Sequence, residues 1–235
     1  MRSCLLQLLI GAALIFALLW FGLPFGASWL ATSALTASGF SGTNTQVEVK
    51  ADLPPRILAG HADSIHVTSD QVSVGDLHSG TIDLTLTTVE LFDRKIGTVA
   101  GTMTGVKIFD PTGQPVTFEK VTVSGDAKNA TSTLTISNAE VATLAAAQLK
   151  ANGVNATVAL AAPDKVVVTA AGSPQPCRLR VTNGSLILVP DGKALPTLTL
   201  IAPGNGNPFK VTSATVGATS LTLVGTIDLQ SLLGI

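Results

Sequence analysis

Apolar residues alternate with Thr, Ser and Asp through most of the chain after residue 46, and this period of two is typical of half-buried β-strands. The run 64–74 changes parity near Asp70, and the run 80–91 changes parity at Thr87–Thr88. We predict a β-bulge or a break near Asp70 and a β-bulge at Thr87–Thr88, because one extra residue in a strand restores the apolar face. Long strands with bulges indicate a strongly curved antiparallel sheet.

One segment has the period of an α-helix instead. Ser137 and Glu140 form the S-x-x-E pattern of a capping box, and Asn152–Gly153 supplies a stop signal. Between these signals lies one apolar stripe, formed by Val141, Leu144, Ala145 and Leu149. We therefore predict one main α-helix over about 138–151. Its many alanines make it slender enough to approach other backbone closely.

Two shorter signals complete the expected elements. In "DLPPRILAG" (52–60), the prolines stand at the first helical positions and Gly60 stands where a helix would stop, which predicts a short helical turn near 54–59. The stretch "TNGS" (182–185) between two apolar runs predicts a hairpin. The fold class is thus α+β and mostly β, with a long curved antiparallel sheet curled around the main helix. Such a shape can leave an elongated apolar cavity between sheet and helix.

The first part of the chain has a different character. From Ser3 to Val47 it contains no Asp, Glu, Lys, Arg or His, and residues 4–23 are long and apolar enough for a membrane-spanning helix. We expect residues 1–45 to be a signal peptide or a membrane anchor followed by a flexible tether, and residues 46–235 to form a single β-rich domain. The expected location is the cell envelope, either anchored on the outer side of the cytoplasmic membrane or secreted.

Charge and cysteine content narrow the possible functions. The 235 residues carry a formal net charge of −1, with acids and bases scattered, so we expect no nucleic-acid partner. The two cysteines are Cys4, in the apolar N-terminal segment, and Cys177, in the β-rich part. No internal disulfide is expected in that part. Cys177 shares a strand face with Leu179, which is typical of a buried structural thiol.

Candidate chemistry is sparse. His61 and His66 would point to opposite faces of a regular strand, so we expect no metal site. The chain has no G-x-S-x-G, H-E-x-x-H, P-loop or paired-carboxylate motif. We therefore expect no catalytic residues, no cofactor and no enzymatic activity. An enzyme acting on envelope lipids or glycans would need a polar cluster inside the cavity.

Three stretches, taken in order along the chain, carry a resemblance to a known family: "LPPRILAGHADSIHVTSDQVSVGDL", "ATSTLTISNAEVATLAAAQL" and "LRVTNGSLILVPDG". Together they resemble the LmeA-like phospholipid-binding family of bacterial envelope proteins over roughly residues 47–235. The resemblance implies a tubular-lipid-binding type of fold, in which a curled sheet wraps a helix and holds acyl chains. It also implies binding of a phospholipid or a related amphiphile outside the cytoplasmic membrane.

Two hypotheses about function follow. In the first, an exported protein holds a phospholipid or other amphiphile for storage, presentation or transfer, and contacts the cytoplasmic membrane through residues 4–23. The alternative is a structural or adhesive envelope protein with a packed interior and no ligand. The candidate cavity-wall residues, each of which could equally be packed core, are Ile57, Leu58, Leu84, Leu86, Val141, Leu144, Ala145 and Leu149. Protein partners are not predicted by the sequence.

Overall fold

The computed structural model describes residues 40–74, 77–90, 92–93, 95–109, 115–161, 165–192, 195–203 and 209–228. Within these ranges the chain forms thirteen strands, one 3-10 helix and one α-helix. No helix among the described residues combines the length and the apolar composition needed to cross a membrane. The predicted segment 4–23 lies outside the described residues.

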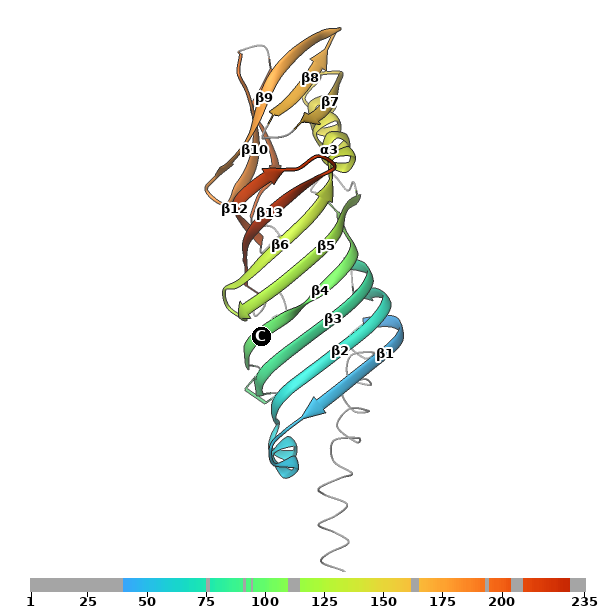
Figure 1. Ribbon diagram of the computed structural model, residues 1–235, viewed down its shortest axis with the longest axis vertical. Coiled ribbons are helices and arrows are strands. Elements are labelled where there is room, and N and C mark those ends of the chain that lie inside the picture. The colour runs from blue at the N-terminus through green and yellow to red at the C-terminus, as the bar shows by residue number, and fades with distance from the viewer. Residues whose placement is uncertain are drawn as a thin grey trace, which may run out of the picture.

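The strands form two antiparallel sheets (Figure 1). The larger sheet has eight strands, in the spatial order β1 (Phe40–Lys50), β2 (His61–Val74), β3 (Leu77–Glu90), β4 (Lys95–Phe109), β5 (Pro115–Asp126), β6 (Ala130–Ser137), β13 (Ser220–Ile227) and β12 (Phe209–Val216). The smaller sheet has the order β11 (Leu198–Ile201), β10 (Ser185–Pro190), β9 (Ser173–Thr182), β8 (Lys165–Ala170) and β7 (Ala156–Ala161). The predominantly β fold with curved antiparallel sheets and one main helix is confirmed.

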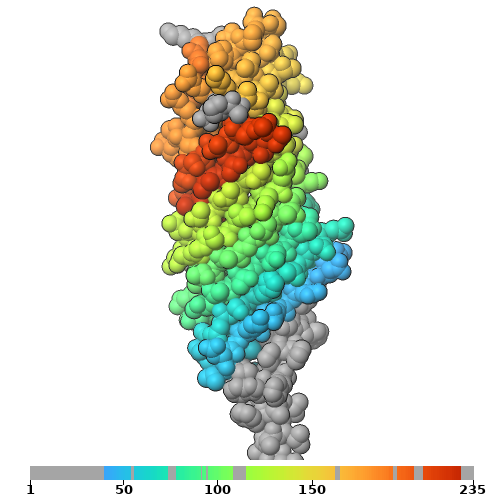
Figure 2. Space-filling model, viewed as in Figure 1, coloured from blue at the N-terminus to red at the C-terminus, as the bar shows by residue number. Residues whose placement is uncertain are grey.

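The molecule is elongated, and the strands of the larger sheet cross its long axis obliquely (Figure 1). Figure 2 shows these strands as successive oblique bands, with the C-terminal β12 and β13 seated beside β6. The 3-10 helix η2 (Pro54–Ala59) lies at one end of the molecule, and the smaller sheet lies at the other (Figure 1). The α-helix α3 (Asn138–Ala151) follows β6 and contacts strands of both sheets.

Local signals explain where α3 begins and ends. The Ser137 hydroxyl accepts a hydrogen bond from the N–H of Glu140 at 3.1 Å, as the capping box predicts. The Glu140 carboxylate accepts instead from the N–H of Thr117 in β5, at 2.9 Å, and so ties the start of the helix to the sheet. At the other end Gly153 has φ 80, and the N–H of Val154 donates to the carbonyl of Leu149. The predicted bounds of the helix are confirmed.

The parity change near Asp70 has the second of the two predicted forms, a break in the extended backbone. The β2–β3 register runs unshifted through Asp70↔Thr81 and Val72↔Ser79, so there is no bulge in this pairing. The change falls at Gln71, with φ 49, and the β4 residue Gly105 also has a positive φ of 59. Neighbouring strands change parity together, so their pairing stays in register. The shifts near Asp70 occur on β1, between Ser41 and Gln46.

The same concerted change occurs at Thr88, with φ 51. Pairing on both sides of β3 continues in register past this residue, through Thr87↔Thr98 and Val89↔Ile96 on the β4 side. The bulge predicted at Thr87–Thr88 is therefore wrong, because the register does not shift there. One residue in the left-handed region lets the apolar side chains on both sides of it share a face, so the sheet keeps a single apolar face.

Strand β1 begins earlier than expected. Phe40 pairs with Val74, so residues 40–45, which we predicted to be tether, belong to the sheet. Side-chain hydrogen bonds to β2 replace apolar burial here: Asn44 Nδ2 donates to Asp70 Oδ2 at 3.0 Å, and Thr45 Oγ1 lies 2.7 Å from Ser69 Oγ. Polar sequence can therefore continue an edge strand. The rest of the predicted tether lies outside the described residues.

The buried side chains form one large cluster and two small ones. The large cluster lies where α3, β5, β6, β12 and β13 meet the smaller sheet. The small clusters lie on β1–β6 of the larger sheet, one of them beside η2. The opposite face of the larger sheet is rich in Thr and Ser, with hydroxyl pairs such as Thr81–Thr104 at 2.6 Å and Thr87–Thr98 at 2.5 Å. The larger sheet therefore has an apolar inner face and a hydroxyl-rich outer face.

Candidate functional site

The inner face of β2–β4 carries a contiguous apolar surface. Val67 pairs with Leu84, and Leu84 pairs with Gly101, so these three residues form a row across the strands. Leu86, two residues further along β3, stands on the same face and pairs with Ile65. Val67, Leu84 and Leu86 are half-buried, and each packs against a small core cluster. This surface is apolar without being fully covered.

The surface continues towards η2. Ile57 packs against the cluster that contains Val47 and Val49 of β1, and Leu86 packs against the same cluster. Leu58, the next residue of η2, is 62% exposed. The structure therefore brings Ile57, Leu84 and Leu86 to one continuous apolar region, with Leu58 at its exposed end.

The predicted residues on α3 lie elsewhere. The stripe belongs to the large cluster, and none of its members is more than 6% exposed; they are Val141, Leu144, Ala145 and Leu149. The helix contacts β7 and β11 of the smaller sheet and β5, β6 and β13 of the larger one. The eight candidates thus divide into two groups, one on η2 and β3 and the other beneath α3. Their contact with a lipid stays a prediction.

Sequence reasoning missed two residues of the inner face. Val67 stands in the row with Leu84, and its parity with Ile65 was a usable signal. Met103 of β4 pairs with Ile82, is half-buried and packs against the large cluster. The sequence does not show which face of the strand Met103 occupies, because the small residues on either side of it give little apolar contrast between alternate positions.

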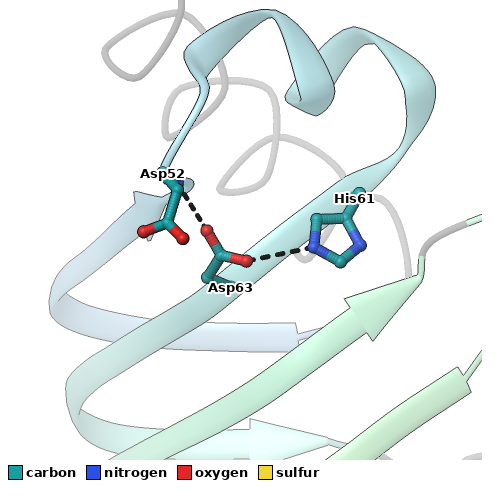
Figure 3. A network of polar contacts seen from close by, with 3 residues as sticks. All are labelled: Asp52, His61 and Asp63. Atoms are coloured by element: carbon teal, nitrogen blue, oxygen red, sulfur yellow. Dashed lines mark hydrogen bonds and ion pairs between the residues drawn. The ribbon is translucent and has the colours of Figure 1, made fainter.

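A polar network holds the loop that carries η2 (Figure 3). Asp63 Oδ2 accepts from the backbone N–H of Asp52 at 2.5 Å, and Asp63 Oδ1 lies 3.0 Å from His61 Nε2. The hydrogen bond from the Asp52 N–H, followed by that from His61, lowers the pKa of the Asp63 carboxyl below its ordinary value of 3.8. The carboxylate thereby joins both ends of the loop.

The histidines have separate carboxylate partners. His66 Nε2 lies 2.8 Å from Asp83 Oδ1 in the neighbouring strand, whereas His61 is held by Asp63. Within the described part of the chain, no three side chains of His, Cys, Asp or Glu gather in a group that could hold a metal ion. Both histidines are accounted for by these pairs.

Cys177 lies in the large core cluster and is 2% exposed. Burial, and to a lesser extent the negative charge of Asp191, raises the pKa of its thiol above the ordinary value. A raised pKa keeps the sulfur protonated, and the thiol is a much weaker nucleophile than the thiolate. The residue therefore behaves as core.

The fold and the inner face define a β-rich protein with a curved sheet, apolar inside and hydroxyl-rich outside. A family model described as LmeA-like phospholipid-binding matches residues 25–226. The chain belongs to this family, and the resemblance drawn from the three sequence stretches is confirmed. Searches of curated proteins and of solved structures found no significant match.

Proposed function

We propose that this protein binds a phospholipid or a related amphiphile with its acyl chains against the inner face of the larger sheet. Membership of a phospholipid-binding family supports the class of ligand. The observation that supports the location is the half-buried state of Val67, Leu84 and Leu86 on β2 and β3. Each buried CH₂ group of an acyl chain contributes about 0.8 kcal/mol, so covering these side chains with part of one chain gives useful affinity.

The dimensions of the sheet suit such a ligand. Eight strands at a spacing of about 4.8 Å span about 34 Å across the strands. One leaflet of a bilayer contributes about half of the ~30 Å hydrocarbon core, so the length of an acyl chain fits within the inner face. The proposed elongated cavity lies along β2–β4 and opens towards η2.

The proposed setting is the cell envelope, with storage, presentation or transfer of the lipid as the role. The apolar, uncharged segment 4–23 supports export and either a retained anchor or a cleaved signal. We propose binding without catalysis, an expectation supported by the lack of a G-x-S-x-G, H-E-x-x-H, P-loop or paired-carboxylate motif in the sequence.

A structural or adhesive role is the alternative, and the closely buried cluster beneath α3 favours it. In that case the half-buried inner face of β2–β4 is incompletely covered core, and the purified protein contains no amphiphile. The two functions therefore differ in one measurable quantity, the lipid content of the folded protein.

The deciding experiment extracts lipid from the purified full chain and compares two variants. Leu84→Asp places a carboxylate on the inner face, whereas Thr85→Asp places one on the outer face one residue away. Because an unpaired charge cannot share an apolar site with acyl chains, we expect phospholipid in the parent and in Thr85→Asp, and at least about tenfold less in Leu84→Asp. Native mass spectrometry measures the lipid-to-protein ratio, and circular dichroism confirms that each variant is folded.

Absence of any amphiphile from the parent, together with no thermal shift on adding phospholipid, would contradict lipid binding and favour the structural alternative. Equal lipid loss in both folded variants would place the ligand away from the inner face.

A further inference from the structure

Three large apolar side chains are exposed among the described residues, and all three lie at one end of the molecule. Leu53 is 51% exposed, Leu58 is 62% exposed and Phe92 is 76% exposed. Leu53 and Leu58 belong to the loop of η2, and Phe92 belongs to the turn between β3 and β4. Exposed apolar side chains are ordinary when scattered, but three gathered at one tip mark a contact surface. We call Leu53, Leu58 and Phe92 the apolar tip.

Backbone geometry shows that the two loops meet. Gly60 ends η2 with φ 78, and a Cβ built on it would lie 2.6 Å from the ring of Phe92. The aromatic ring therefore rests directly on Gly60, two residues from Leu58. His61 and Lys95, which follow the two loops, each pair with Glu90, so the sheet fixes both loops side by side.

The tip is presented by a held loop. The N–H of Arg56 donates to the carbonyl of Leu53, and the N–H of Gly60 donates to the carbonyl of Ile57. Asp63 then joins the two ends of the loop through Asp52 and His61 (Figure 3). Because the loop is already ordered, it loses little conformational entropy when its side chains bind a partner, and this favours binding.

One basic side chain, that of Arg56, accompanies the apolar side chains on the η2 loop. Arg56 is exposed and stands in the sequence between Leu53 and Leu58, whereas Lys95, which follows Phe92 by three residues, is exposed but pairs with Asp93 at 3.4 Å. Apolar side chains next to long basic ones suit the boundary between acyl chains and phosphate headgroups, because the aliphatic stems enter the apolar zone while the charges reach the phosphates.

The tip is also continuous with the proposed lipid site. Ile57 of η2 packs into the cluster that Leu86 joins on the inner face of the sheet. We propose that the apolar tip docks on the surface of a phospholipid bilayer, so that lipid passes between the bilayer and the inner face at this end. The docking role deepens the proposed function and rests on it for the passage of lipid.

The test places a tryptophan at the tip. The natural tryptophans, Trp20 and Trp29, both lie outside the described residues, so a difference spectrum against the parent chain isolates an introduced one. Phe92→Trp keeps an aromatic ring at the tip, and Thr157→Trp on the exposed side of β7 serves as the matched control at the far end. Each full-length chain is mixed with vesicles of phosphatidylcholine and phosphatidylglycerol that carry bromine on their acyl chains, and quenching is measured.

We expect bromine to quench the indole introduced by Phe92→Trp and to leave the indole introduced by Thr157→Trp unquenched. In a second measurement, the double variant Leu58→Ser and Phe92→Ser transfers fluorescent phosphatidylglycerol between vesicles at least about tenfold more slowly than the parent. Its melting temperature stays unchanged, because both side chains are exposed. Thr157→Ser is the matched control for transfer and keeps the parental rate.

An unquenched indole in the Phe92→Trp variant would overturn docking, as would equal quenching in the Phe92→Trp and Thr157→Trp variants. Dimerisation in the absence of vesicles that the double serine variant abolishes would assign the tip to a second copy of the chain instead. The two proposals fail separately. If the protein contains lipid but the Phe92→Trp variant is not quenched, the proposed function stands and the docking role falls. If the Phe92→Trp variant is quenched but the protein contains no lipid, the docking of the tip on a bilayer stands and the proposed lipid-binding function falls.

Discussion

At the scale of single residues, Asp63 explains how an exposed loop keeps one conformation. Its carboxylate accepts from the N–H of Asp52 and from His61, and these hydrogen bonds lower the pKa of the carboxyl. A group with a lowered folded-state pKa stabilises the folded state above its unfolded pKa, near 3.8. The contribution is lost as the pH falls through the folded value. The sequence does not reveal this pairing, because η2 separates Asp63 from Asp52.

We predict that Asp63→Asn loosens the η2 loop at neutral pH. The amide of Asn has no charge to attract the N–H of Asp52, so hydrogen exchange of the amides in residues 52–60 should quicken. The difference between variant and parent should shrink as the pH falls below 3.8 and through the lowered pKa of Asp63 in the folded parent, where the parent also loses this charge. Hydrogen exchange with mass spectrometry measures the exchange rates of these amides at each pH.

Asp93→Asn is the control, because its carboxylate makes an exposed ion pair with Lys95 at 3.4 Å in the other loop. In the Asp93→Asn variant, hydrogen exchange of the amides in residues 52–60 should be the same as in the parent. A pH-independent difference for Asp63→Asn would show that the charge of Asp63 has no part in holding the loop.

At the scale of elements, α3 was predictable because its signals are local. The Ser137 cap, the apolar stripe and Gly153 lie within one short segment, and each acts through neighbouring residues. The partner of Glu140 was not predictable, because Thr117 lies in another strand and becomes adjacent only after the sheet forms. The parity changes in β2 and β3 were predictable from the sequence for the same reason, because each shows within a few neighbouring residues. That the neighbouring strands change parity at matching positions could not be predicted, because it depends on how the strands pair.

We predict that Ser137→Ala destabilises the folded protein by about 1 kcal/mol, because the N–H of Glu140 loses its acceptor at the start of the helix. Chemical denaturation measures the free energy of unfolding. Thr143→Ala is the matched control: the Thr143 hydroxyl donates to the carbonyl of Ala139, four residues earlier on an exposed face. Replacing such a residue by Ala should be neutral or slightly stabilising. A neutral Ser137→Ala would mean that the cap contributes nothing to α3.

At the scale of the whole molecule, the two ends differ in how their apolar residues are covered. The end with α3 has two sheets and a helix around one cluster, whereas β1–β4 contribute an inner face that stays half-buried in part. The sequence predicted apolar stripes at both ends correctly. It could not tell that Leu144 would be enclosed and Leu86 less so, because coverage depends on the smaller sheet, which meets α3 from later in the chain.

We predict a crossed pattern for two matched truncations. Leu144→Ala should lower the free energy of unfolding by 2–5 kcal/mol, roughly the range for enclosed leucines, and leave the lipid content unchanged. Leu86→Ala removes the same atoms from a half-buried site, so it should cost about 1 kcal/mol or less in the lipid-free protein and reduce the lipid content. Added phospholipid should then stabilise Leu144→Ala as much as the parent and Leu86→Ala less, since a ligand stabilises the state that binds it. Denaturation with and without lipid, together with mass spectrometry of the bound lipid, tests each arm. The opposite pattern would move the ligand beneath α3 and leave the inner face of β2–β4 as ordinary core.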